Sequence, residues 1–92
     1  MKMIRVHVFI FGDVIGVGFR AWISHRAKNL GLTGWVRNAP VGIVEAVFEG
    51  PKEKVEEMIE LCRKGPEVSW VEKIETKWEE ATGEFISFDI RV

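Results

Sequence analysis

The hydrophobic period of the chain switches repeatedly between about two and about 3.6 residues, and this switching constrains the fold more than any other feature. A period of two is typical of a half-buried strand, and a period of 3.6 is typical of a helix with one apolar face. The strand-like segments are residues 5–11, 34–38, 43–49, 68–79 and 85–92, and the helix-like segments are residues 19–30 and 51–64. Residues 39–42, Ala-Pro-Val-Gly, have the composition of a hairpin connection. The predicted order is therefore β-α-β-β-α-β followed by one more strand.

Five of these segments place apolar residues on one face, as packing against a common core requires. These faces are Val6, Val8 and Ile10; Phe19, Ile23, Ala27 and Leu30; Val55, Met58, Ile59 and Cys62; Trp70, Ile74 and Trp78; and Ile86, Phe88 and Ile90. We expect most of the four tryptophans to lie in the core, and His7 to lie on the sheet face away from the helices. The element order predicts a ferredoxin-like α+β sandwich, with two helices on one face of a mainly antiparallel sheet.

Composition limits the functions that such a chain can have. Its 92 residues predict one domain over 1–92, and 13 basic against 14 acidic side chains leave no general attraction to nucleic acid or anionic membranes. Cys62 is the single cysteine, so no intramolecular disulfide can form, and no Cys/His cluster has the spacing of metal ligands. Arg5 and His7 interrupt the first apolar run well before the length of a signal or membrane helix. We expect a cytoplasmic protein and a monomer.

A loop with three glycines, residues 12–18, joins the first predicted strand to the first predicted helix. Exposed backbone N–H groups and the helix dipole can bind an anion such as phosphate there, and glycine lets the ligand approach the backbone. A plain tight turn is the alternative, and glycines alone favour it. The loop lacks the Gly-Lys-Ser/Thr ending of a nucleotide P-loop. Its match to a dinucleotide-binding pattern is accidental, because the chain is too short for a doubly wound sheet.

Two polar residues could act on such an anion. Arg20 falls in the first helical turn, where its charge opposes the helix dipole unless a bound phosphate offsets it; a surface ion pair with Asp13 is an equal alternative. Asn38 ends the second strand, where its amide could orient a water molecule towards a phosphoryl group. Spacing alone instead favours an Asx-type turn for Asn38, in which the side chain bonds its own backbone.

Residues 16–20, Gly-Val-Gly-Phe-Arg, followed by residues 30–38, Leu-Gly-Leu-Thr-Gly-Trp-Val-Arg-Asn, resemble the signature of the acylphosphatase family. The resemblance covers essentially the whole chain. It implies a metal-free and cofactor-free hydrolase that acts on a small-molecule acyl phosphate and releases inorganic phosphate. It also implies that Arg20 and Asn38 are catalytic, with Asn38 positioning the attacking water. The implied phosphate-binding residues are Val14, Ile15, Gly16, Val17, Gly18, Phe19 and Arg20.

The loop departs from the family pattern at two positions. Asp13 and Ile15 stand where members usually carry Arg and Gln, so a carboxylate and an apolar group replace a cation and an amide. We expect weaker phosphate affinity, and the alternative is a non-catalytic anion-binding module, like the acylphosphatase-like domains of larger maturation enzymes. A third hypothesis, an RNA binder that uses aromatic residues on the sheet, is disfavoured by the near-neutral charge and the lack of a basic-aromatic run.

Overall fold

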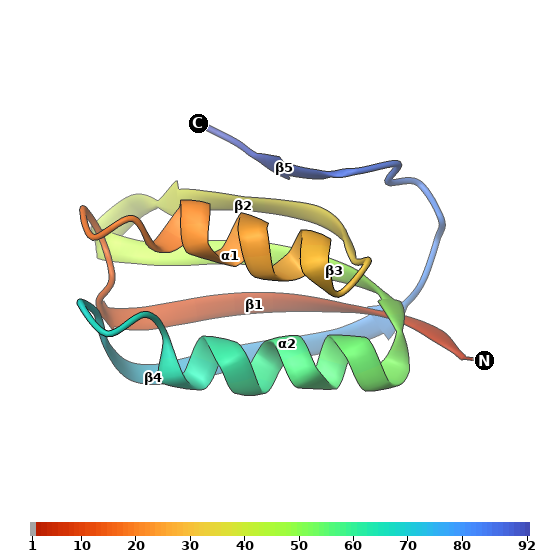
Figure 1. Cartoon of the computed structure of the whole chain (residues 1–92), viewed down its shortest axis with the longest axis horizontal. Coiled ribbons are helices and arrows are strands. Elements are labelled where there is room, and N and C mark those ends of the chain that lie inside the picture. The colour runs from red at the N-terminus through yellow and green to blue at the C-terminus, as the bar shows by residue number, and fades with distance from the viewer. Residues whose placement is uncertain (1) are drawn as a thin grey trace.

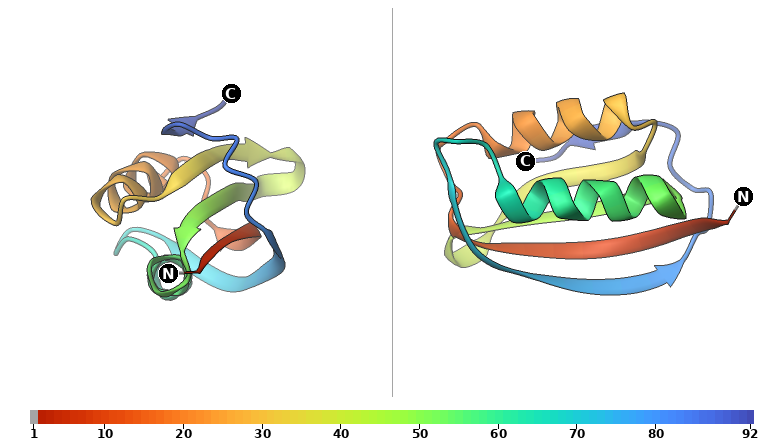
Figure 2. Two further views of the ribbon diagram at one scale, coloured as in Figure 1. Left: turned by 90° about the vertical axis from the view of Figure 1, so that its right-hand side faces the viewer. Right: turned by 60° about the horizontal axis from the view of Figure 1, so that its bottom comes forward.

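A computed structural model describes residues 2–92 as one sheet of five strands with two helices on one face (Figures 1 and 2). The elements are β1 (Met3–Asp13), α1 (Phe19–Asn29), β2 (Thr33–Ala39), η1 (Pro40–Gly42), β3 (Ile43–Pro51), α2 (Lys52–Lys64), β4 (Trp70–Glu80) and β5 (Phe88–Ile90). The strand order is β4-β1-β3-β2-β5, and every neighbouring pair is antiparallel except β2 and β5. The predicted ferredoxin-like α+β sandwich is confirmed. None of the helices in residues 2–92 is long and apolar enough to cross a membrane.

The core lies between the two helices and the sheet, and the helical stripes that periodicity predicts form much of it. Phe19, Ile23 and Ala27 of α1 are buried, as are Val55, Met58, Ile59 and Cys62 of α2, and Leu30 packs at the margin. From β1, the side chains of Val6, Val8 and Ile10 are fully buried beneath the helices. Burial raises the pKa of the Cys62 thiol to about 12, so this thiol is an inert packing group.

The prediction that most tryptophans are core residues is wrong. Trp70 and Trp78 are 71% and 49% exposed, and Trp22 and Trp35 are half-buried. Trp70 also does not share a face with Ile74, because the β1–β4 register shifts at Phe11/Gly12 and the bulge reverses the alternation along β4. Val71 packs against the core there instead.

The last strand is shorter than predicted. Only Phe88–Ile90 pair with β2, since residues 81–87 carry the chain from β4 at one edge of the sheet to β5 at the other (Figure 1). Phe88 is buried and stacks on Phe48 with ring centroids 5.5 Å apart, whereas Ile86 is 96% exposed and does not join it. The apolar pattern of this segment therefore predicted a strand in the right place but with too many buried residues.

Two buried carboxylates lie on the open face of the sheet. Glu49 accepts hydrogen bonds from Arg5 Nε at 2.8 Å and from the backbone N–H groups of Gly83 and Thr82 at 2.8 and 3.2 Å. Burial alone would raise the pKa of Glu49, but these hydrogen bonds outweigh it and lower the pKa. The Glu45 carboxylate is hydrogen-bonded to His7 Nε2 at 2.6 Å, and it accepts a hydrogen bond from Arg37 Nε at 2.7 Å. The hydrogen bonds lower the pKa of both carboxyl groups, which favours their ionised forms.

Acid should therefore destabilise the fold through Glu49. Because its folded-state pKa lies below the ordinary value of 4.5, its contribution is complete above pH 4.5 and is lost as the pH falls through the folded-state pKa. Glu49→Gln should lower the free energy of unfolding at pH 7 by about 1 to 3 kcal/mol and should lose less stability on acidification. Urea unfolding from pH 7 to pH 3 measures this, with exposed Glu57→Gln as the control. Equal acid sensitivity of Glu49→Gln and the unaltered protein would contradict the assignment.

Candidate active site

The glycine-rich loop turns the chain from the end of β1 into the start of α1. Gly16 and Gly18 have φ values of 78° and 77°, in the left-handed region that favours glycine. A Cβ added at either position would meet nothing within 4 Å. Glycine is therefore needed here for its backbone conformation rather than for close packing, and the space beside the loop is open to a ligand.

Backbone N–H groups of this loop are available to a ligand. Within residues 2–92, no protein acceptor binds the N–H groups of residues 14–20, and the first helical bond runs from the Trp22 N–H to the Gly18 carbonyl at 3.0 Å. Helix α1 begins at Phe19 with no acidic residue in its first turn, so its dipole adds positive potential at the loop. The loop and the first turn of α1 therefore present N–H donors and positive potential at the same place.

A hollow of about 190 Å³ lies against this loop. Four elements contribute to its lining, which consists of Val14, Gly16, Gly18, Phe19, Arg20, Ala21, Asn38 and Ile90. Arg20 and Asn38, which are far apart in sequence, thus meet at one cavity. Asn38 reaches it because alternate residues of β2 face the helices, with Val36 buried two positions earlier. Of the predicted phosphate-binding residues, Ile15 and Val17 do not line the hollow: Ile15 is 38% exposed, and Val17 packs on the core margin.

The structure also addresses the alternatives for the two polar side chains. In the described chain, Arg20 forms no ion pair with Asp13 or any other acid. The Asn38 amide makes no hydrogen bond to backbone within residues 2–92, so no Asx turn is present. Both residues line the hollow, and within residues 2–92 neither side chain is occupied by another protein group.

Sequence reasoning missed two lining residues, Ala21 and Ile90. Ile90 reaches the hollow because β5 pairs in parallel with β2, opposite Val36. Two backbone hydrogen bonds hold this pairing, from the Arg91 N–H to the Val36 carbonyl at 2.8 Å and from the Gly34 N–H to the Ser87 carbonyl at 3.0 Å. Periodicity placed Ile90 on an apolar face, but no local signal identifies the partner strand of β5.

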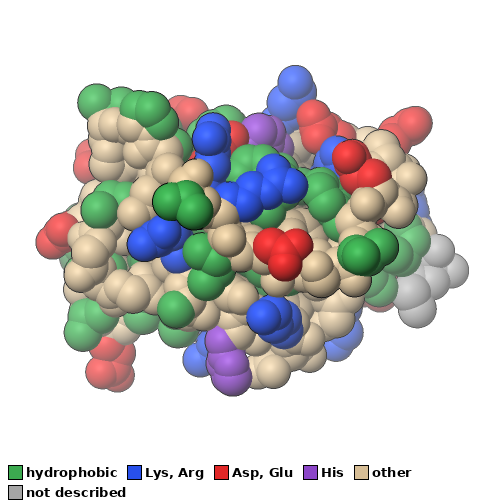
Figure 3. All heavy atoms as spheres, turned by 90° about the horizontal axis from the view of Figure 1, so that it is seen from above, with side chains coloured by type: hydrophobic (Ala, Val, Ile, Leu, Met, Phe, Trp, Pro, Cys, Tyr) green, Lys and Arg blue, Asp and Glu red, His purple; other side chains and the backbone are tan. Residues whose placement is uncertain are grey.

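Charged side chains of both signs lie on the face seen from above, where acidic side chains stand among the Lys and Arg side chains (Figure 3). No group of three or more His, Cys, Asp or Glu that could hold a metal ion occurs among residues 2–92.

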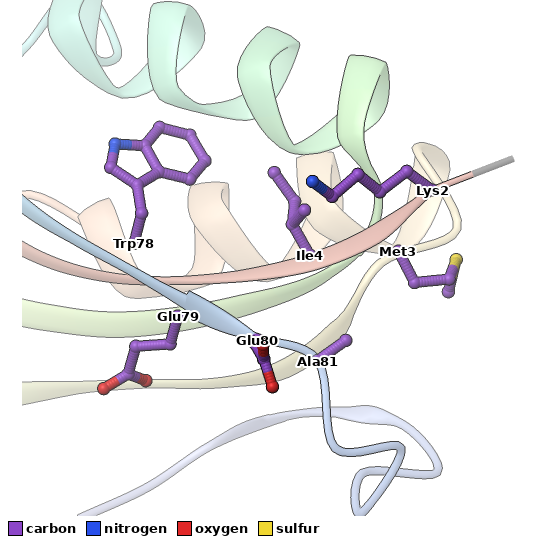
Figure 4. Close-up of a pocket in the computed structure, with 7 residues that line it drawn as sticks. All are labelled: Lys2, Met3, Ile4, Trp78, Glu79, Glu80 and Ala81. Carbon is purple, nitrogen blue, oxygen red and sulfur yellow. The ribbon is translucent and has the colours of Figure 1, made fainter.

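A larger hollow, of about 550 Å³, lies at the opposite end of β1 and β4 (Figure 4). Its lining is Lys2, Met3, Ile4, Trp78, Glu79, Glu80 and Ala81. It contains no glycine loop, and its two carboxylates outnumber the one ammonium group, that of Lys2, so an anion would not be favoured there. The smaller hollow is the candidate active site.

Known proteins share the sequence and the fold of this chain. The family model Acylphosphatase matches residues 6–90. An acylphosphatase of Syntrophobacter fumaroxidans is 52% identical over 86 residues, which cover 94% of this chain and 89% of that protein. The crystal structure of acylphosphatase from Bacillus subtilis superposes with a TM-score of 0.93 at 29% identity, covering 97% of this chain and 99% of that one.

A second kind of structural neighbour is HypF of Thermococcus kodakarensis, with a TM-score of 0.83 and 31% identity. The match covers 97% of this chain but 12% of HypF, so the same fold also occurs as a small part of a much larger protein. The family match over nearly the whole chain, the relative at 52% identity and the close structural superposition lead to one conclusion. This chain belongs to the acylphosphatase family and is an acylphosphatase.

Proposed function

We propose that this enzyme hydrolyses the carboxyl-phosphate bond of small acyl phosphates without a metal, with the phosphoryl group bound at the glycine-rich loop. One observation carries the proposal: the unpartnered N–H groups of residues 14–20, Arg20 and Asn38 all meet at one hollow. The products are a carboxylate and inorganic phosphate.

Phosphate binding is assigned to the loop and to Arg20. The N–H groups of residues 14–20 donate to phosphate oxygens, and the Arg20 guanidinium can donate two parallel hydrogen bonds. The negative charge of the transferring phosphoryl group is then stabilised by donors that are already oriented. A carboxylate is a good leaving group, so positioning and charge stabilisation supply most of the catalysis.

Asn38 is assigned to the attacking water. Its amide oxygen can accept a hydrogen bond from the water while its N–H groups donate to water or phosphate. The water oxygen forms a bond to phosphorus, and the bond between phosphorus and the acyl oxygen breaks. The electron pair of that bond leaves with the carboxylate, and the water proton passes to a phosphate oxygen of the substrate. No protein general base is required.

The unusual loop residues should tune affinity rather than abolish it. Asp13 is exposed at the end of β1, and neither Asp13 nor Ile15 lines the hollow. The Asp13 charge therefore acts on bound phosphate through solvent, where charge interactions are weak. This placement supports an active enzyme with modest affinity for phosphate.

Neutralising Asp13 should tighten phosphate binding. We expect Asp13→Asn to lower the inhibition constant of inorganic phosphate about two- to fivefold, because a nearby like charge is removed at a solvent-screened site. The measurement is competitive inhibition at low and high salt, and the difference should shrink as salt is added. Glu53→Gln, the same charge change in the first turn of α2, is the control. A salt-independent effect, or none, would show that Asp13 does not act electrostatically on the site.

The proposal is tested by hydrolysis of benzoyl phosphate in the presence of a chelator. We expect turnover that the chelator leaves unchanged and that inorganic phosphate inhibits competitively. Addition of phosphate should also shift the backbone amide NMR resonances of residues 14–20. These shifts should exceed those of the residues that line the larger hollow, such as Ile4 and Trp78. Turnover that disappears with chelator, or phosphate shifts elsewhere, would overturn the proposed site.

We also propose that the enzyme acts in the cytoplasm as a single domain over residues 1–92. The support is compositional: Cys62 is the single cysteine, and it is buried and inert. A chain without disulfides suits a reducing compartment.

A further inference from the structure

An exposed apolar side chain lies at the hollow beside the glycine-rich loop. Val14 and Phe19, two large apolar residues of the lining, are each 1% exposed and belong to the core. Ile90 also lines the hollow, but it is 47% exposed. An apolar surface beside a few polar groups can bind an apolar part of a ligand.

Strand β5 holds Ile90 in a fixed position. Phe88, two residues earlier on the same face of the strand, is buried and stacks on Phe48. Ile90 itself stands opposite Val36 of β2, and β5 lies beside α1 (Figure 1). A contact that is ordered before binding costs little conformational entropy when a ligand covers it. Ile90 is therefore a preorganised apolar contact at the hollow.

The other lining residues leave Ile90 for the acyl group, an argument that rests on the proposed function. The loop N–H groups and Arg20 are assigned to the phosphate oxygens, and Asn38 is assigned to the attacking water. In-line displacement places the leaving oxygen on the side of phosphorus away from that water. Ala21 and Ile90 are the exposed lining residues without an assigned role, so they remain to contact the acyl group that leaves with this oxygen.

The lining offers no partner to a second negative charge on the acyl group. Arg20 is the single charged side chain of this lining, as the described part of the chain defines it. Arg91 follows Ile90 but belongs to the other face of the sheet, where its guanidinium lies 4.8 Å from the centre of the Trp35 ring. A carboxylate beside Ile90 would lose water without gaining a cation, which is unfavourable.

We propose that Ile90 selects the acyl group, so that the enzyme favours acyl phosphates with a short apolar chain over those whose chain carries a second negative charge. The apolar chain covers the exposed surface of Ile90 beside Ala21. Because Ile90 is about half-exposed, each methylene group that reaches it gains about half of the value of full burial, which is about a twofold increase in kcat/KM. Ile90 determines specificity and takes no part in the chemical step.

Three acyl phosphates test the inference on the unaltered enzyme. Butanoyl phosphate adds two methylene groups to acetyl phosphate, and succinyl phosphate carries a carboxylate in place of the terminal methyl group of butanoyl phosphate. With the spontaneous rate of each subtracted, kcat/KM should be about fourfold higher for butanoyl than for acetyl phosphate, mainly through KM. It should be at least about tenfold higher for butanoyl than for succinyl phosphate.

Two substitutions of Ile90 should change these ratios in different ways. Ile90→Ala should bring the butanoyl-to-acetyl ratio towards one, while the inhibition constant of inorganic phosphate changes less than about twofold. Ile90→Lys should raise kcat/KM for succinyl relative to butanoyl phosphate at least about tenfold, and added salt should reduce this gain. Ile86→Ala and Ile86→Lys are the controls, because Ile86 is 96% exposed and does not line the hollow; they should leave both ratios unchanged.

The outcomes separate this inference from the proposed function. No turnover of any of the three phosphates would contradict the proposed function and this inference together. Turnover with equal kcat/KM for all three, or ratios that neither substitution of Ile90 changes, would overturn the role of Ile90 and leave the proposed function standing. A lower unfolding temperature and weaker phosphate inhibition in Ile90→Ala, with no gain for succinyl phosphate in Ile90→Lys, would show that Ile90 only holds β5 in place, which also overturns the inference.

Discussion

Asn38→Ala is expected to lower kcat for benzoyl phosphate at least about a hundredfold while phosphate binding changes less than about threefold. Asn38 lines the hollow but belongs to β2, across from the loop that supplies the phosphate-binding N–H groups. Its removal takes away the group that orients water and leaves the phosphate donors in place. Steady-state kinetics together with the phosphate inhibition constant separate these two effects.

The matched control for this variant is Asn29→Ala. Asn29 lies at the end of α1, is exposed, and has the His25 ring as its side-chain partner at 3.4 Å. Its loss should leave both kcat and phosphate inhibition unchanged. If Asn38→Ala retained turnover near the original value, the assignment of Asn38 to the attacking water would be wrong.

Arg20→Ala is expected to weaken both phosphate binding and turnover. The guanidinium is the one cationic side chain of the hollow as the described residues define it, and it makes no ion pair within residues 2–92. We expect the inhibition constant of phosphate to rise at least about tenfold and kcat/KM to fall about a thousandfold, because charge stabilisation is lost in both complexes.

Arg20→Lys separates charge from geometry. Lysine retains the positive charge but cannot donate two parallel hydrogen bonds from a planar group. It should recover much of the phosphate binding and less of the turnover. Phosphate affinity in Arg20→Ala equal to that of the unaltered enzyme would show that Arg20 does not contact the phosphoryl group.

The two helices and their buried stripes could be predicted because a period of 3.6 is a local property of the sequence. The loop could be assigned for the same reason, but its predicted start at residue 12 is wrong: Gly12 and Asp13 belong to β1 and pair with β4, so the loop begins at Val14. The meeting of Arg20 and Asn38 is different. The residues allowed a role for each, but a surface ion pair explained Arg20 equally well and an Asx turn explained Asn38 better. The family resemblance was needed to bring the two residues together.

Features that depend on strand pairing could not be predicted. Ile90 reaches the hollow only because β5 lies parallel to β2. Trp70 points away from the face of Ile74 because of a bulge opposite Gly12, a residue that sequence reasoning assigned to the loop. The burial of Glu49 depends on Arg5 and on the backbone at Gly83, both of which hold its carboxylate by hydrogen bonds. In each case the partner comes from a distant part of the chain.

The account's central claim is that water attacks the phosphorus of an acyl phosphate held at the glycine-rich loop. Hydrolysis of benzoyl phosphate in ¹⁸O-labelled water, with chelator present, tests this claim most directly. The account predicts turnover in which the label enters inorganic phosphate and is absent from benzoate. Label in benzoate would show attack at the carbonyl carbon, and absence of turnover would show that the hollow only binds an anion; either result would contradict the account.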